Sequence, residues 1–151
     1  MTTFTKNPPP KGWPRLSVSV RYTNATKAID WLCRTFGFEV QLKVEGEPGT
    51  VVHSELMLGE AMIMVGDESP EKDRSWAKSP KELGGANTQN CCFFIDDVDA
   101  HCAIAREHGA IIAKEPTTTD YGDDYWSDRS YEAIDHEGHH WWFMQRMRSK
   151  A

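Results

Sequence analysis

The sequence predicts an α+β protein built from two strand–helix–three-strand (βαβββ) modules, which form a curved, eight-stranded mixed sheet around a concave cavity, with the helices on its convex face. Two observations predict this fold. A strand, an amphipathic helix and three further strands follow one another in residues 16–66, and the same order returns in residues 89–145. A repeat of this size indicates that the two modules bury their apolar faces together.

Length and charge limit the classes of protein to consider. The 151 residues suit one compact domain made by both modules together. A net charge of −6 disfavours a nucleic-acid partner, because phosphate binding needs a basic surface. No apolar run approaches the roughly 20 residues that span a bilayer, and the N-terminus does not resemble a secretory signal. We therefore expect a cytoplasmic protein with no membrane partner, whose four cysteines stay reduced.

Residues 1–15 predict an extended arm. They contain Pro8, Pro9, Pro10 and Pro14, which exclude a helix or a central strand. Since Trp13 gains little by pointing into water, we expect the arm to lie on another surface.

The first module, residues 16–66, has clear start and stop signals. Apolar and polar residues alternate in residues 16–22, beginning with Leu16, which predicts a strand with one face on the core. Asn24 is a good N-cap for the next helix, and Gly37 is a natural stop. Residues 38–44 predict a strand, and residues 51–58 and 60–65 predict a hairpin around Gly59.

A polar linker, residues 67–88, separates the modules. Its length exceeds that of an ordinary loop, so we expect it to carry a helical turn or to cover part of the protein.

The second module, residues 89–145, repeats the order of the first. Residues 90–95 predict a strand, residues 96–99 begin a helix, and Gly109 ends it. Residues 110–114, 130–134 and 139–145 predict the remaining strands, with an aromatic and acidic insertion at residues 121–129 and a tight turn at residues 135–138.

Four segments carry a resemblance to a known family: AIDWLCRTFGFE (28–39), HSEL (53–56), DDVDA (96–100) and DRSYEAIDHEGHHWWF (128–143). With these segments in this order, the chain resembles the glyoxalase/bleomycin-resistance (vicinal oxygen chelate) superfamily, and within it the PhnB-like branch. The resemblance covers nearly all of residues 16–145. It implies a homodimer, with a substrate cavity inside each paired sheet.

The resemblance also implies where a metal would bind. Enzymes of the superfamily hold a divalent metal with four side chains, and the matching positions here are Ser17, Glu55, Asn90 and Trp142. Only Glu55 is a good ligand, since a serine hydroxyl is neutral and an indole can only donate a hydrogen bond. We therefore expect no cofactor. By strand parity, a rearranged site at His53, Glu55 and His140 is the alternative that would hold a divalent metal.

Other side chains are candidates for direct ligand contact. Arg21 could clamp a carboxylate or a phosphate, or form a salt bridge at the rim. The aromatic loop at residues 121–126 could stack on an aromatic or cationic ligand, or pack on another subunit or on the arm. Arg129 could reach the mouth of the cavity or pair with a nearby acid. The full set of expected ligand-binding residues is Ser17, Ser19, Arg21, His53, Glu55, Asn90, Tyr121, Tyr125, Trp126, Arg129 and Trp142.

Three functions follow from these observations. The first is a protein that binds a small aromatic or cationic molecule without the usual metal site. The second is a metal-dependent lyase or dioxygenase that uses His53, Glu55 and His140. The third is a structural or regulatory dimer whose cavity is filled. Whether the chain is an enzyme stays open at this stage.

Overall fold

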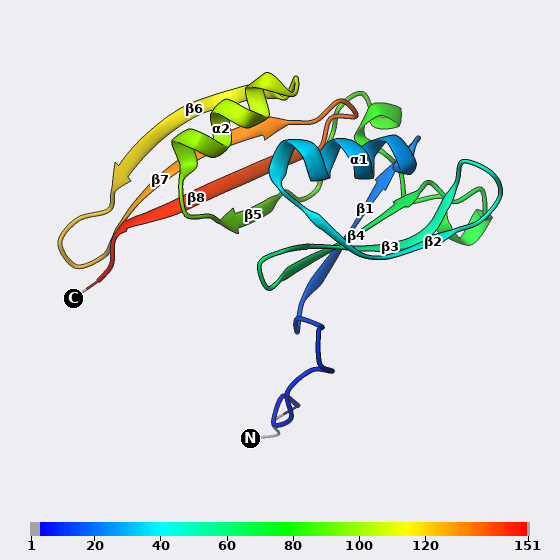
Figure 1. Cartoon of the computed structure of the whole chain (residues 1–151), viewed down its shortest axis with the longest axis horizontal. Helices are drawn as coiled ribbons and strands as arrows, with labels where there is room; N and C mark the ends of the chain where they lie inside the picture. The colour runs from blue at the N-terminus through cyan, green and yellow to red at the C-terminus, as the bar shows by residue number, and fades with distance from the viewer. Residues whose placement is uncertain (1–3, 151) are drawn as a thin grey trace.

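A computed structural model describes residues 4–150 and has eight strands in two four-stranded sheets (Figure 1). The first sheet has the order β1-β4-β3-β2 and the second β5-β8-β7-β6. In each sheet the first strand of the module pairs parallel with the last, and the other pairs are antiparallel. The strands are β1 (Ser17–Tyr22), β2 (Glu39–Glu45), β3 (Val51–Leu58), β4 (Ala61–Asp67), β5 (Cys91–Phe94), β6 (Ile111–Asp120), β7 (Ser127–Ile134) and β8 (His140–Arg148).

This architecture confirms the α+β class and the two βαβββ modules. The eight strands are divided between two sheets, and the sheets do not close around a cavity. Both helices, α1 (Ala25–Phe36) and α2 (Val98–Glu107), lie on one side of the sheets, so the opposite faces are open (Figure 1). Within the described residues, no helix is long and apolar enough to cross a membrane.

The helix boundaries follow from their caps. The Asn24 side chain accepts a hydrogen bond from the backbone N–H of Lys27, and the Asp97 side chain accepts one from Ala100. Each satisfies a backbone donor that the first helical turn leaves free. Gly37 ends α1 with a φ of 79°, a left-handed conformation that glycine adopts without strain.

The two modules share one apolar core. Phe36, at the end of α1, lies with its ring centroid 4.8 Å from that of Phe143 in β8. Phe38 meets Phe93 of β5 edge to face, at 5.5 Å. These aromatic pairs join the first module to the second sheet, so the modules pack as one unit.

The β6–β7 hairpin is longer than the sequence predicted. β6 continues to Asp120 and β7 begins at Ser127, so the expected insertion shrinks to a loop of residues 121–126. The predicted strand ended at residue 114, just before Pro116, a residue that is unfavourable inside a sheet. β6 lies at the edge of its sheet, and register shifts flank Lys114, so the missing N–H of Pro116 is tolerated.

The arm and the linker differ in how they lie. The described part of the arm extends away from the body (Figure 1), and Leu16 is 76% exposed, so the buried side of β1 begins only after it. Residues 1–3 of the predicted arm lie outside the described residues. The linker contains two short 3₁₀ helices, η1 (Lys72–Arg74) and η2 (Pro80–Leu83), which supply the helical turns expected of so long a connection.

Candidate functional site

A cavity of about 580 Å³ lies at the junction of the two modules. Its walls come from β1, from the linker and from the segment where β5 and β8 begin. β1 and β5 are the edge strands of their sheets, so the cavity lies between two sheet edges and is flanked by the linker. Its volume is within the range of sites that hold small molecules.

The turn between β7 and β8 holds the junction together. Asp135 is 3% exposed, and its carboxylate accepts hydrogen bonds from the Tyr22 hydroxyl at 2.6 Å and from the Trp141 indole at 3.0 Å. The backbone N–H groups of Glu137 and His139 also donate to it. One buried carboxylate therefore ties the end of β1 to the start of β8.

Glu137 performs a second anchoring role. Its carboxylate accepts hydrogen bonds from the backbone of Thr23 at 2.7 Å and Asn24 at 3.2 Å, and from the Ser79 hydroxyl at 2.7 Å. Burial alone would raise the pKa of this carboxyl, but these hydrogen bonds outweigh burial and lower its pKa. The contact with Ser79 fastens the linker beside the cavity.

Three of the expected ligand-binding residues, Ser19, Arg21 and Asn90, line the cavity, together with His140, which was expected only in the alternative metal site. Arg21 pairs with Gly66 across β1 and β4, and one guanidinium nitrogen donates to the backbone oxygen of Asp67 at 3.3 Å. A Cβ atom at Gly66 would lie 2.7 Å from Nη1 of Arg21, so the glycine leaves the space that the guanidinium occupies.

The cavity lining is cationic. Arg21, Arg74 and Lys78 contribute to it, and no aspartate or glutamate belongs to the lining in the part of the chain that is described. Trp76, 79% exposed, adds a large aromatic surface from the linker. Sequence reasoning missed the three linker residues, because a polar linker gives no periodic signal that places its side chains.

His53 and Glu55 lie elsewhere, on the open face of β3. Nε2 of His53 is 3.0 Å from Oε1 of Glu55, and the Gln41 amide donates to the other carboxylate oxygen at 3.0 Å. Hydrogen bonds from His53 and Gln41 lower the pKa of the Glu55 carboxyl. Parity correctly placed the two side chains on one face, but neither lines the cavity.

The rearranged metal site is not assembled within one chain. His140 lies on β8 in the other sheet, where Nδ1 is 2.5 Å from Oε1 of Glu132. Among the described residues, no group of three His, Cys, Asp or Glu side chains could hold a metal ion. The Glu132 partner was not expected, because pairing it with His140 requires the register of β7 against β8.

Strand register also identifies which residues of the two modules are equivalent. Ser19 and Cys92 each lie five residues before the cap of the following helix, so they are equivalent. Ser19 pairs with Met64, and Cys92 pairs with Trp142. The counterpart of Trp142 is therefore Met64 and not Glu55. Neither a thioether nor an indole suits a hard divalent cation, so these residues do not fit the metal of the superfamily's enzymes.

The aromatic loop lies at the far end of the second sheet. Tyr121 and Tyr125 are more than half exposed, and neither lines the cavity. The guanidinium of Arg146 lies over the rings of Trp126, at 5.1 Å, and Phe94, at 5.3 Å. Protein side chains therefore already use part of this aromatic surface for cation–π contacts.

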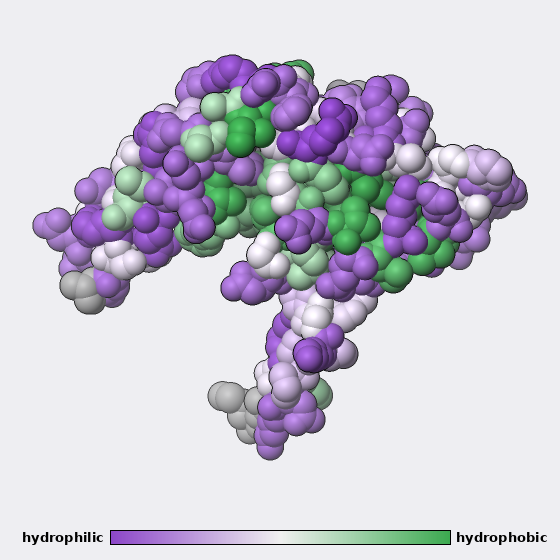
Figure 2. Space-filling view, in the orientation of Figure 1, coloured by the Kyte–Doolittle hydropathy of each residue, from purple (hydrophilic) through white to green (hydrophobic). Residues whose placement is uncertain are grey.

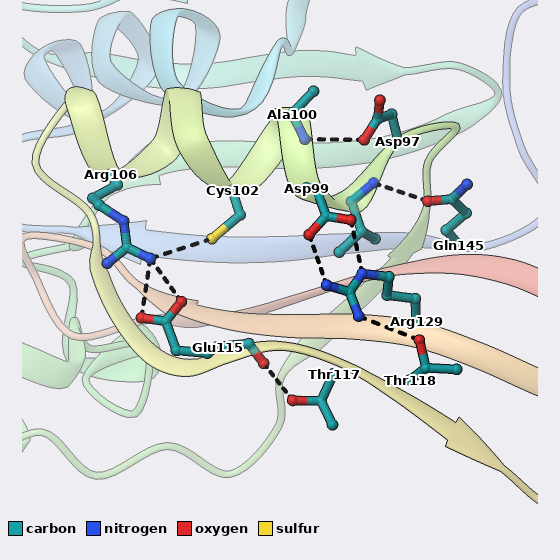
Figure 3. A network of polar contacts seen from close by, with 11 residues as sticks. Asp97, Asp99, Ala100, Cys102, Arg106, Glu115, Thr117, Thr118, Arg129 and Gln145 are labelled. Atoms are coloured by element: carbon teal, nitrogen blue, oxygen red, sulfur yellow. Dashed lines mark hydrogen bonds and ion pairs between the residues drawn. The ribbon is translucent and has the colours of Figure 1, made fainter.

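Arg129 points to the helix side of its sheet and not to the cavity (Figure 3). Nε and Nη2 of Arg129 donate to the two carboxylate oxygens of Asp99 on α2 at 2.8 and 2.7 Å. A second pair, Arg106 with Glu115, lies nearby between α2 and β6. Arg129 pairs with Asp99 through two nitrogens, whereas one nitrogen of Arg106 donates to both oxygens of Glu115. Both ion pairs fasten α2 to its sheet, so Arg129 has a structural partner that its position in the sequence did not reveal.

Comparisons with known proteins agree with the fold. A family model described as "Glyoxalase/Bleomycin resistance protein/Dioxygenase superfamily" matches residues 16–143. A Mycobacterium tuberculosis H37Rv protein described as uncharacterized is 29% identical over 135 residues, which cover 89% of this chain and 76% of that protein.

Two solved structures extend the comparison. TioX from Micromonospora sp. ML1 is 28% identical, with a TM-score of 0.68, over 89% of this chain and 99% of that one. TnmS3 from Streptomyces sp. CB03234, described as an antibiotic binding protein, is 21% identical, with a TM-score of 0.62, over 86% of this chain and 93% of that one. The second likeness shows a shared fold alone.

Proposed function

Because the chain belongs to the Glyoxalase/Bleomycin resistance protein/Dioxygenase superfamily, we propose that it binds a small aromatic molecule without the metal site of the superfamily's enzymes. The observation that carries this proposal is the cavity of about 580 Å³ at the module junction. Membership of the PhnB-like branch and a cytoplasmic location, where the free cysteines would stay reduced, belong to the same proposal.

The lining supports an aromatic ligand more than a cationic one. Trp76 offers an exposed aromatic surface, and Ser19 and Asn90 offer hydrogen-bonding groups. A cationic ligand would be repelled by the positive side chains of this cavity, because the described lining has no carboxylate to balance them. TnmS3, which has the same fold, is described as an antibiotic binding protein, so a small-molecule binder on this fold has a precedent.

The proposal predicts saturable binding of a neutral aromatic probe. Titration of the protein with 2-naphthol in excess EDTA, followed by fluorescence, should show one site per chain. The replacement Ala86→Trp puts an indole into the cavity lining and should weaken binding at least tenfold. The matched replacement Ala100→Trp, at an exposed position near the start of α2, should leave binding unchanged. Binding that Ala86→Trp does not weaken, or no saturable binding, would refute the proposal.

We also propose that the protein is a homodimer. Large apolar side chains are exposed on the open faces of both sheets, including Leu42 (43%), Val44 (42%) and Phe94 (59%). Figure 2 shows apolar surface along the side of the body from which the arm extends. Exposed apolar surface of this extent is typical of an interface. Sedimentation equilibrium should give about 34 kDa, twice the 17.2 kDa of one chain, and a mass near 17.2 kDa would contradict this.

A further inference from the structure

We infer that the ligand of the junction cavity carries an oxyanion, a carboxylate or a phosphate, which Arg21 binds. This inference rests on the proposed function and names the chemistry of the same site. It is carried by the charge of the lining, by the guanidinium of Arg21, which makes no ion pair among the described residues, and by the glycine that makes room for it.

The charge of the lining is opposite to that of the whole chain. The sequence has 23 acidic and 17 basic residues, with a net charge of −6. The cavity lining nevertheless has Arg21, Arg74 and Lys78 and no acidic side chain among the described residues. A concave site lined by charges of one sign raises the local concentration of ions of the opposite sign. The lining therefore favours an anion.

Arg21 is the cation best placed to bind it. Within the described residues it makes no ion pair, and a backbone oxygen, that of Asp67, accepts its one hydrogen bond. The Asp67 carboxylate is occupied elsewhere, since it accepts hydrogen bonds from the backbone N–H groups of Ala25 and Val51. A guanidinium has five N–H donors in a planar fork that matches two oxygens of a carboxylate or a phosphate.

Arg74 and Lys78 contribute to the field around the cavity and do not form a clamp. Arg74 lies 3.9 Å from Glu71, and Lys78 lies 3.6 Å from Glu68, distances longer than those of close ion pairs. Both acidic partners lie outside the lining. The two linker cations can therefore turn toward a bound anion without breaking a tight contact, while Arg21 supplies the directional hydrogen bonds.

Probes of one shape and different charge test the inference. Benzoate, phenyl phosphate, neutral benzamide and cationic benzamidine would be titrated into the protein by calorimetry at low salt. Benzoate and phenyl phosphate should bind at least tenfold more tightly than benzamide, and benzamidine more weakly than benzamide. The stronger of the two anions identifies which oxyanion the cavity prefers.

Arg21→Gln should weaken benzoate binding by about tenfold to a hundredfold, the range that charge-assisted hydrogen bonds supply, and should weaken benzamide binding much less. The matched control Lys27→Gln removes a cation from α1, away from the cavity lining, and should have no such effect. Gly66→Ala removes no charge, but its Cβ would displace the Arg21 guanidinium, so it should weaken benzoate binding severalfold at little cost in stability.

The outcomes separate the inference from the proposed function. If benzamide and benzoate bind equally, or Arg21→Gln weakens neither, the oxyanion inference fails while binding in the cavity stands. If none of the four probes binds, and 2-naphthol does not bind either, both fail. Loss of benzoate binding in Arg21→Gln counts as support where circular dichroism and the melting temperature match those of the parent protein.

Discussion

Replacing Asp135 by alanine is expected to lower the free energy of unfolding by about 3–5 kcal/mol. The Asp135 carboxylate is 3% exposed and accepts four hydrogen bonds, including those from Tyr22 and Trp141. Alanine would leave these donors buried without an acceptor, and each such group loses its interaction with water as well. Urea denaturation at neutral pH measures the effect.

Asp120→Ala is the matched control for this replacement. Asp120 pairs with Arg148 at 2.6 Å, but both side chains are largely exposed, so its removal should be much less destabilising than that of Asp135. If Asp135→Ala were no more destabilising than Asp120→Ala, Asp135 would not hold the junction of the modules.

Phe36→Ala is expected to have a comparably large effect, a loss of about 3–5 kcal/mol, because it empties the space between α1 and the second sheet. Phe36 is 1% exposed, and its ring meets those of Trp31, His101 and Phe143 at centroid distances of 4.8–5.9 Å. Thermal unfolding by circular dichroism should remain a single transition at a lower temperature, because both modules share one core.

Ile104→Ala is the control for Phe36→Ala. Ile104 lies in α2 and is 46% exposed, so its replacement should lower the free energy of unfolding by less than about 1 kcal/mol. A second transition in the Phe36→Ala variant, with one module unfolding before the other, would show that the modules have separate cores.

Both replacements bear on the site as well as on stability. Asp135 orients the turn that carries His139, whose ring Nε2 donates to the backbone oxygen of Arg21 at 2.7 Å. The same turn holds Glu137 against Ser79 of the linker. The contacts that join the modules therefore also set the walls of the cavity and the position of the linker at Ser79.

Local signals in the sequence were sufficient for most of the fold. Asn24 and Gly37 bound α1 because caps depend on residues within one turn of the helix. Alternation in β1 and β3 placed Arg21, His53 and Glu55 on the polar faces, because parity is a property of one strand. Such features need no knowledge of distant parts of the chain.

Features that depend on distant residues could not be predicted in this way. The extension of β6 past Pro116 depends on its being an edge strand, which is a property of the whole sheet. Arg129 meets Asp99 because α2 packs above β7, and Glu132 meets His140 through the register of β7 and β8. The approach of Arg74 and Lys78 to Arg21 depends on how the linker folds back.

The position of the aromatic loop also depends on distant parts of the chain. Tyr121, Tyr125 and Trp126 were expected at the mouth of the cavity because exposed aromatic side chains suit a ligand. The long β6–β7 hairpin places them at the far end of the second sheet, where Arg146 lies over Trp126. The aromatic side chain that does reach the cavity from a loop is Trp76, which no periodic pattern distinguished.

A crystal structure of the benzoate complex, grown with excess EDTA, would show directly whether Arg21 binds an oxyanion in the cavity. We expect the benzene ring in the cavity at the module junction, with the carboxylate about 2.7–2.9 Å from the guanidinium nitrogens of Arg21. Benzoate bound on the open face of the second sheet beside Trp142, or in the cavity with its carboxylate turned away from Arg21, would contradict it.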